Sequence, residues 1–182
     1  TGCGMVRPPL IVPDSRDPRS IMANHLYDLV RLYATDPGKT FIETDNGTVF
    51  TYDDLFAATG RFANALVASG VKPGDRVAVQ VEKSPGAIFL YLACVRAGAV
   101  FLPLNTAYTP TEIDYFLNDA KPRVFVCDPA KRDGLAATAE GAGARLETLG
   151  ARAPDAGSLH EQADAASGEF ATVAGQPSDL AA

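Results

Sequence analysis

The feature that most constrains the fold is an alternation of apolar runs and capped helical segments between residues 76 and 149. The segments between the runs begin at Ser84, Thr109 and Asp128, which are favoured helix caps and are each followed by proline, a favoured first helical residue. Because a helical crossover returns the chain to the same end of a sheet, the strands must be parallel. The sequence predicts an α/β fold in which helices flank a parallel sheet, with strands at 76–81, 99–102, 123–127 and 144–149.

A small β-hairpin is predicted near the start, before this sheet. Strand-like runs at 39–44 and 48–51 flank Asn46-Gly47, a dipeptide typical of tight hairpin turns. Thr51 then caps a long helix, and Gly70 ends it because glycine adopts the left-handed backbone conformation without a steric penalty.

Two further helices have distinct apolar patterns. Asn24 can cap a helix whose apolar residues at helical spacing are Leu26, Leu29, Val30 and Tyr33. The helix that follows Ser84 is apolar on nearly all sides, and we therefore expect it to be buried.

Composition divides the chain into three segments. Residues 1–21 are rich in proline and arginine without the apolar stretch of a secretory signal, which indicates a disordered leader or a cloning remnant, with Met22 as the natural start. Residues 22–150 carry the α/β pattern. Residues 151–182 are rich in alanine, glycine, serine and proline and are expected to form a loop-rich connection, with a weak helix at 158–165.

Charge and hydropathy exclude two classes of partner. With a formal net charge of −6 at pH 7, the chain lacks the basic surface that binding to a phosphate backbone requires, so no nucleic acid partner is expected. No apolar run reaches the roughly 18–20 residues that a membrane-spanning helix needs, so no membrane span is expected.

The cysteines and histidines do not form a metal-binding pattern. Cys3, Cys94 and Cys127 include no C-x-x-C pair, and the two histidines are His25 and His160, which argues against a structural zinc site. Cys94 and Cys127 lie in apolar runs and are expected to be buried, reduced thiols. Reduced thiols and the lack of a signal favour a cytoplasmic location, and a mitochondrial or plastid location stays open.

Two short stretches share part of the pattern of nucleotide-binding loops. Gly38-Lys39-Thr40 matches the end of a P-loop, but Tyr33 stands where the first glycine belongs and a strand, not a helix, follows. Gly141 and Gly143 begin a G-x-G pattern, but Leu146 occupies the third glycine position. A turn and a helix end explain these stretches better than a phosphate site.

Polar side chains also fail to form an acid–base or nucleophile arrangement. Asp53 and Asp54 open a helix and point to different faces, where they favour the positive end of the helix dipole. His25 and His160 have no partner at a spacing typical of a catalytic triad, and Ser84 is explained by its capping role. We therefore assign no catalytic, cofactor-binding or metal-binding residue.

Three longer blocks follow one another as in a known family: FTYDDL at 50–55, GVKPGDRVAV at 70–79 and LYLACVRAGAVFLPLN at 90–105. From about residue 22 to 182 the chain resembles the opening part of the adenylate-forming superfamily, which includes acyl-CoA synthetases, peptide-synthetase adenylation domains and luciferases. The resemblance implies that the α/β fold is the N-terminal subdomain of such an enzyme.

Finer features are similar to malonyl-CoA synthetases. They are QVEKS at 80–84, LNTAYT at 104–109 and DYF at 114–116, and Thr106 stands where several other acyl-CoA ligases carry proline. This resemblance implies a parent reaction in which malonate or methylmalonate attacks the α-phosphate of ATP. An acyl-adenylate and pyrophosphate form, and the thiol of coenzyme A then displaces AMP, with Mg²⁺ neutralising phosphate charge.

The catalytic elements of that family all follow the region matched here. They are a phosphate loop rich in serine, threonine and glycine, a Thr-Glu metal site, a ribose-binding aspartate and a C-terminal lysine. The resemblance thus implies ATP, Mg²⁺, CoA and a small carboxylate as ligands of the parent enzyme. It also implies that this chain is inactive without the remainder of the ligase and binds none of the cofactors tightly.

Other interpretations stay open at this point. The loop 105–109 follows the carboxyl end of a strand and could border the active site or the CoA channel, although a connector in which Thr109 caps a helix explains it better. The parent could be another fatty-acyl or aryl-CoA ligase. The chain could also be a non-catalytic, flavodoxin-like binding module, but no glycine-rich loop follows any strand.

Overall fold

The computed structural model describes residues 24–151, 156–176 and 178–182. The predicted leader at 1–21 and the proposed start at Met22 lie outside the described residues.

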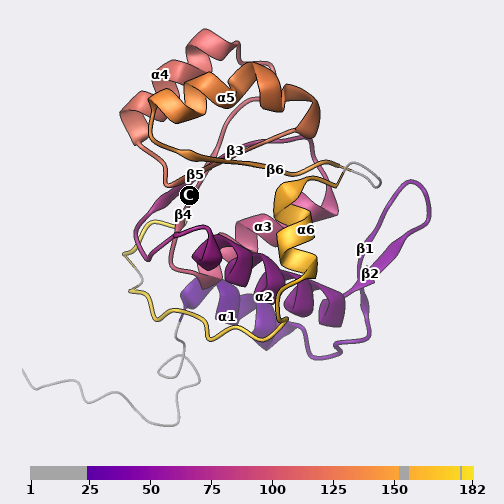
Figure 1. Ribbon diagram of the computed structural model, residues 1–182. Helices are drawn as coiled ribbons and strands as arrows, with labels where there is room; N and C mark the ends of the chain where they lie inside the picture. Colours follow the sequence, from indigo (N-terminus) through magenta and orange to yellow (C-terminus); the bar gives the residue numbers. More distant parts are fainter. Residues whose placement is uncertain (1–23, 152–155, 177) are drawn as a thin grey trace, which may run out of the picture.

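A four-stranded sheet forms the centre of the molecule (Figure 1). Its strands are β3 (Arg76–Gln80), β4 (Val100–Pro103), β5 (Val124–Cys127) and β6 (Arg145–Thr148), in the order β4-β3-β5-β6. All three pairings are parallel, with Val77 opposite both Phe101 and Val124. The predicted fold class and strand positions are confirmed.

Helices cover both faces of the sheet (Figure 1). One face carries α2 (Tyr52–Ala68), α3 (Pro85–Arg96) and α6 (Ser158–Asp164). The other carries α4 (Pro110–Ala120), the 3₁₀ turn η2 (Pro129–Lys131) and α5 (Arg132–Gly141). Two apolar clusters fill the two interfaces. The helix α3 is buried as expected, since Leu90, Ala93 and Cys94 are completely enclosed.

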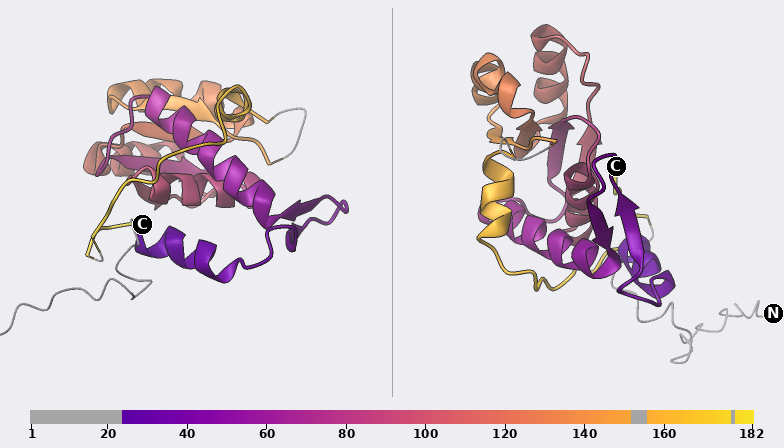
Figure 2. Two further views of the ribbon diagram at one scale, coloured as in Figure 1. Left: turned by 90° about the horizontal axis from the view of Figure 1, so that it is seen from below. Right: turned by 90° about the vertical axis from the view of Figure 1, so that its right-hand side faces the viewer.

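The predicted hairpin is formed by β1 (Thr40–Glu43) and β2 (Val49–Thr51), which pair antiparallel and project from the helical layers (Figure 2). Its base is fixed by aromatic contacts, since the ring of Phe50 meets that of Phe89 edge-on at 5.5 Å. This contact connects the hairpin to α3, so the projecting element still belongs to the main core.

Local sequence signals account for the helix ends. Thr51 and Thr109 each form a reciprocal capping box, with Asp54 and Glu112 respectively. Gly70 ends α2 with φ of 89°, a left-handed conformation that glycine adopts most readily. These predicted boundaries are confirmed because they depend on contacts within a few residues.

The first helix, α1 (His25–Tyr33), presents a different face to the core than its leucine spacing suggests. Tyr27 is buried, whereas Leu29 and Tyr33 are 41% and 79% exposed. The orientation follows from two contacts with α3: Asn24 Nδ2 donates to Val95 O at 3.0 Å, and the Arg96 guanidinium lies 4.6 Å from the centre of the Tyr27 ring. The apolar stripe exists, but most of it faces outward.

The C-terminal part of the chain, which was predicted to be a loop-rich connection, also contributes buried side chains to the core. Leu159 and Ala163 of α6 are buried against α2. Beyond α6, a strap formed by residues 165–176 crosses α2 and α3 (Figure 2). Asn64 Nδ2 on α2 donates to the carbonyls of Ser167 and Glu169 at 2.8 and 2.9 Å, which fixes the strap to the helix.

We predict that the strap requires glycine at position 60. A Cβ atom on Gly60 would lie 1.8 Å from Gly168 O, so Gly60→Ala must displace the strap. Chemical denaturation should show a loss of about 1–3 kcal/mol in the free energy of unfolding. The matched control is Gly134→Ala in α5, where a Cβ meets nothing within 4 Å and alanine should be neutral or stabilising. Equal stability of the two variants would contradict the close approach.

Candidate functional site

The topology indicates where on the sheet a ligand is expected, namely at the carboxyl ends of the strands, which we call the carboxyl edge. From β3 the chain passes to β4 on one side, and β5 then lies on the other side of β3. The carboxyl ends of β3 and β5 therefore flank the point where the strand order reverses, the usual ligand-binding crevice of open α/β sheets. Gln80, Cys127 and the loop 105–109 lie at this edge.

Gln80 is the polar side chain at the centre of this edge. It ends β3 and is 1% exposed. Its Nε2 donates to Asn105 O at 2.9 Å and to Tyr108 O at 3.3 Å, whereas Oε1 is buried without a partner in the described part of the chain. The side chain therefore holds the loop 105–109 against the sheet. A polar residue directly after the apolar run Val77-Ala78-Val79 was the sequence signal for this role.

The loop 105–109 is further fixed from both sides. Lys131 Nζ donates to Thr106 O at 2.7 Å, and the Asn105 side chain accepts from Ala107 N at 2.9 Å. Thr109 caps α4, as the connector interpretation expects. These groups are engaged in holding the loop, and a role at an active site or CoA channel stays a prediction.

The thiol of Cys127, at the carboxyl edge of the sheet, is not activated as a nucleophile. Burial, with a smaller effect of the neighbouring Asp128, raises the pKa of Cys127 to about 11. Burial likewise raises the pKa of Cys94, which lies within α3. Both thiols are free and buried, as predicted, and at neutral pH neither supplies a thiolate nucleophile.

Of the two aspartates at the start of α2, Asp54 has a structural role as part of the helix cap. Asp54 accepts from Thr51 N at 2.8 Å and from Thr51 Oγ1 at 2.7 Å. The backbone hydrogen bond, followed by the hydroxyl one, holds the pKa of Asp54 below its usual value. A carboxylate that is stabilised in its ionised form by a helix cap is poorly suited to act as a general acid.

The remaining polar candidates are also separated from one another. His160 Nδ1 lies 3.1 Å from Asp164 Oδ2 on the surface of α6. Ser158 donates instead to Glu147 Oε2 at 2.6 Å, and Ser84 accepts from Ala87 N as the cap of α3. No serine, histidine and carboxylate triad is assembled in the part of the chain that the structure describes.

The two glycine-containing stretches are turns. Gly38 N donates to Asp36 Oδ1 at 3.1 Å and the chain enters β1 two residues later. Gly143 has φ of 71° and follows the end of α5, just before β6. Neither stretch opens a helix, so neither forms the phosphate cradle of a nucleotide-binding loop.

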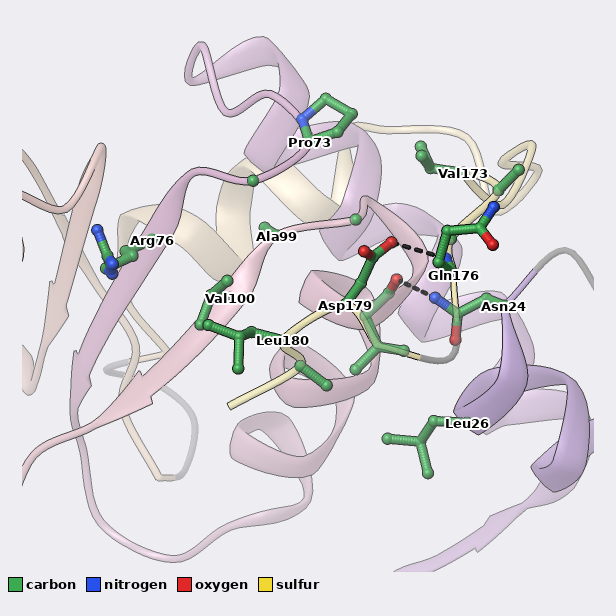
Figure 3. Close-up of a pocket in the computed structure, with 16 residues that line it drawn as sticks. Asn24, Leu26, Pro73, Arg76, Ala99, Val100, Val173, Gln176, Asp179 and Leu180 are labelled. Atoms are coloured by element: carbon green, nitrogen blue, oxygen red, sulfur yellow. Dashed lines mark hydrogen bonds between the residues drawn. The ribbon is translucent and has the colours of Figure 1, made fainter.

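A cavity of about 540 Å³ lies at the opposite, amino end of the sheet (Figure 3). It is lined by the start of α1, the beginnings of β3 and β4, and residues 173–176 and 179–181. Its polar groups are partly engaged: Asp179 Oδ2 accepts from Gln176 N at 2.7 Å, and Asn24 donates to Val95 O. The cavity was not predicted, because its walls come from distant parts of the chain.

Two searches of the described residues bear on metal ions and membranes. Within residues 24–151, 156–176 and 178–182, no three His, Cys, Asp or Glu side chains are grouped so that they could hold a metal ion. None of the helices in these ranges is long and apolar enough to cross a bilayer. The assignment of no catalytic, cofactor-binding or metal-binding residue stays a prediction.

The fold and the sequence together define the class of this protein. Residues 31–182 match the AMP-binding enzyme family, and the chain belongs to that family. It superposes on the crystal structure of apo MatB from Rhodopseudomonas palustris with a TM-score of 0.81 and 54% sequence identity. The match covers 87% of this chain and 31% of the MatB chain.

Two further relatives are named for aromatic acids. Feruloyl-CoA synthase from an Amycolatopsis species is 41% identical over 95 residues, which are 52% of this chain and 19% of that enzyme. A benzoate CoA ligase from Burkholderia xenovorans LB400 has a TM-score of 0.74 and 29% identity over 87% of this chain and 32% of its own. The chain thus spans about a fifth to a third of these relatives. The resemblance to the adenylate-forming superfamily is confirmed.

We predict that the buried thiols resist alkylation in the native state. In a Cys3→Ser variant at pH 8, iodoacetamide should modify Cys94 and Cys127 at least roughly 100-fold more slowly than in denaturant, because burial disfavours the thiolate. Peptide mass spectrometry measures both rates, and the denatured sample is the control. Rapid native labelling of Cys127 would show that the carboxyl edge holds an accessible, reactive thiol.

Proposed function

We propose that this chain is the N-terminal part of an AMP-forming acyl-CoA ligase that activates malonate or methylmalonate. The observation that carries the proposal is the 54% identity with MatB, a malonyl-CoA synthetase, over 87% of the chain. The benzoate CoA ligase aligns with the same share of this chain at only 29% identity. The difference favours the dicarboxylate enzyme over the aryl enzyme.

In the proposed parent reaction, malonate, ATP and CoA give malonyl-CoA, AMP and pyrophosphate through an acyl-adenylate. The described residues contribute a rigid scaffold: the sheet, its two helical layers and the fixed loop 105–109. ATP, Mg²⁺ and CoA would be held mainly by parts of the parent enzyme outside this chain, since the resemblance implies that the family's catalytic elements follow the matched region. The chain alone would therefore be inactive.

The domain organisation follows from the same proposal. Residues 22–150 would form the N-terminal subdomain, preceded by a leader at 1–21. Residues 151–182 would lead toward the phosphate loop of the parent while also packing on α2 through α6. We propose a cytoplasmic location on the basis of the reduced, buried thiols.

An aryl-CoA ligase is the second candidate. It is favoured by the 41% identity with feruloyl-CoA synthase over 95 residues. That match covers 52% of this chain, however, against 87% for MatB. A free-standing flavodoxin-like module has less support, because the family match extends over residues 31–182.

Pyrophosphate exchange tests the proposal. We expect the 182-residue chain to show no malonate-dependent exchange of pyrophosphate into ATP. The full-length protein that contains this chain should catalyse the exchange with malonate or methylmalonate at a kcat/KM at least about 100-fold above that with ferulate or benzoate. A preference for an aryl acid would overturn the malonate assignment, and exchange by the chain alone would overturn the scaffold role.

A further inference from the structure

Arg96, the last residue of α3, connects helix α2 to the strap. Its side chain is buried, and its Nη1 atom donates to Phe56 O at 3.1 Å and to Thr59 Oγ1 at 3.0 Å, both on α2. Its Nη2 atom donates to Phe170 O at 2.8 Å on the strap. Because a guanidinium is planar and presents its donors in a fixed fork, this one group holds α2 and the strap at a set separation.

Two further contacts fix the strap on the helices. Val173 N donates to Arg96 O at 2.8 Å, so the backbone of Arg96 holds the strap as well as its side chain. On α2, Asn64 Nδ2 donates to the carbonyls of Ser167 and Glu169 at 2.8 and 2.9 Å. The middle of the strap therefore has a defined path over α2 and α3.

The end of the strap passes this constraint on to the last residues of the chain. Asp179 N donates to Gln176 O at 3.0 Å, and Gln176 N donates to Asp179 Oδ2 at 2.7 Å, which closes a tight turn (Figure 3). Ala181 O then accepts from Phe101 N at 3.0 Å. The place at which the chain reaches its last residues thus depends on where Arg96 holds the strap.

We propose that Arg96 is a positioning residue of the ligase, which sets through the strap the place from which the chain continues to the phosphate loop that binds ATP. The inference rests on the proposed function, in which residues 151–182 lead toward that loop. Arg96 touches no substrate in this role and acts through Phe170 and Val173. A misplacement of about 1 Å, caused far from the chemistry, can lower a rate on the order of 100-fold.

The KM for ATP in pyrophosphate exchange by the full-length protein tests this role. Arg96→Lys keeps the charge but replaces the planar fork by a single flexible ammonium, which does not reproduce the contacts to α2 and the strap together. We expect the KM for ATP to rise at least about 5-fold. Asn64→Ala removes the other side-chain anchor of the strap and should raise the KM for ATP as well.

Leu90→Ala is the matched control. Leu90 is completely enclosed in α3, so alanine should lower Tm by leaving a cavity, but its apolar side chain makes no hydrogen bond to the strap. A purely structural loss reduces the amount of active enzyme, which lowers the apparent kcat and leaves the KM unchanged. We therefore expect the KM for ATP of Leu90→Ala to stay within about 2-fold of the unchanged protein.

Hydrogen exchange of the same full-length proteins gives a readout that does not depend on catalysis. The amide of Val173, which bonds to Arg96 O, reports on the strap, and the amide of Leu104, which bonds to Val79 O, reports on the sheet. The Val173 amide should exchange at least about 10-fold faster relative to the Leu104 amide in Arg96→Lys and Asn64→Ala. This ratio should not change in Leu90→Ala.

The outcomes separate the positioning role from the proposed function. An unchanged KM for ATP in both strap variants, an equal rise in Leu90→Ala, or an unchanged exchange ratio in the strap variants would overturn the positioning role. If Arg96→Lys does not fold, Asn64→Ala decides alone. A full-length protein without substitutions that shows no exchange with any carboxylate would overturn the proposed function and this role with it. A preference for an aryl acid would overturn only the malonate assignment, because both candidate ligases use ATP.

Discussion

The helical layer under the sheet depends on one buried cation. The Arg96 side chain donates to Phe56 O, Thr59 Oγ1 and Phe170 O, at 3.1, 3.0 and 2.8 Å, and lies against the rings of Tyr27 and Phe170. Burial lowers its pKa from the usual value, so carbonyl dipoles and ring faces must stabilise the charge. One guanidinium thereby joins α1, α2, α3 and the strap, and these elements hold their positions together.

The strap connects the helical layer that Arg96 holds together to strand β4 of the sheet. Gly60 allows Gly168 to pass close to α2, and Arg96 fixes Phe170 and Val173 over α3. The last residues then reach β4, where Ala181 accepts one hydrogen bond. The N-terminal half and the C-terminal strap are therefore one packing unit. That arrangement agrees with a chain that spans about a third of its structural relatives.

The carboxyl edge of the sheet shows why such a scaffold need not carry chemistry. Gln80 and Lys131 use their donors to hold the loop 105–109, and Cys127 has a raised pKa. A rigid edge positions whatever binds beside it without supplying a nucleophile or a metal ligand of its own. The chain belongs to the AMP-binding enzyme family, and the 54% identity with MatB supports the proposal that the parent enzyme is an acyl-CoA ligase for malonate or methylmalonate.

The sequence by itself determined the helix boundaries and the parallel sheet, because caps such as Thr51 and Thr109 act within three residues and helical crossovers dictate strand direction. The assignment of no catalytic residue also came from the sequence and stays a prediction. Only the tertiary structure decided the strand order, the outward-facing leucines of α1, the cavity and the strap. These depend on contacts between distant residues, such as Arg96 with Phe170, which no local pattern encodes.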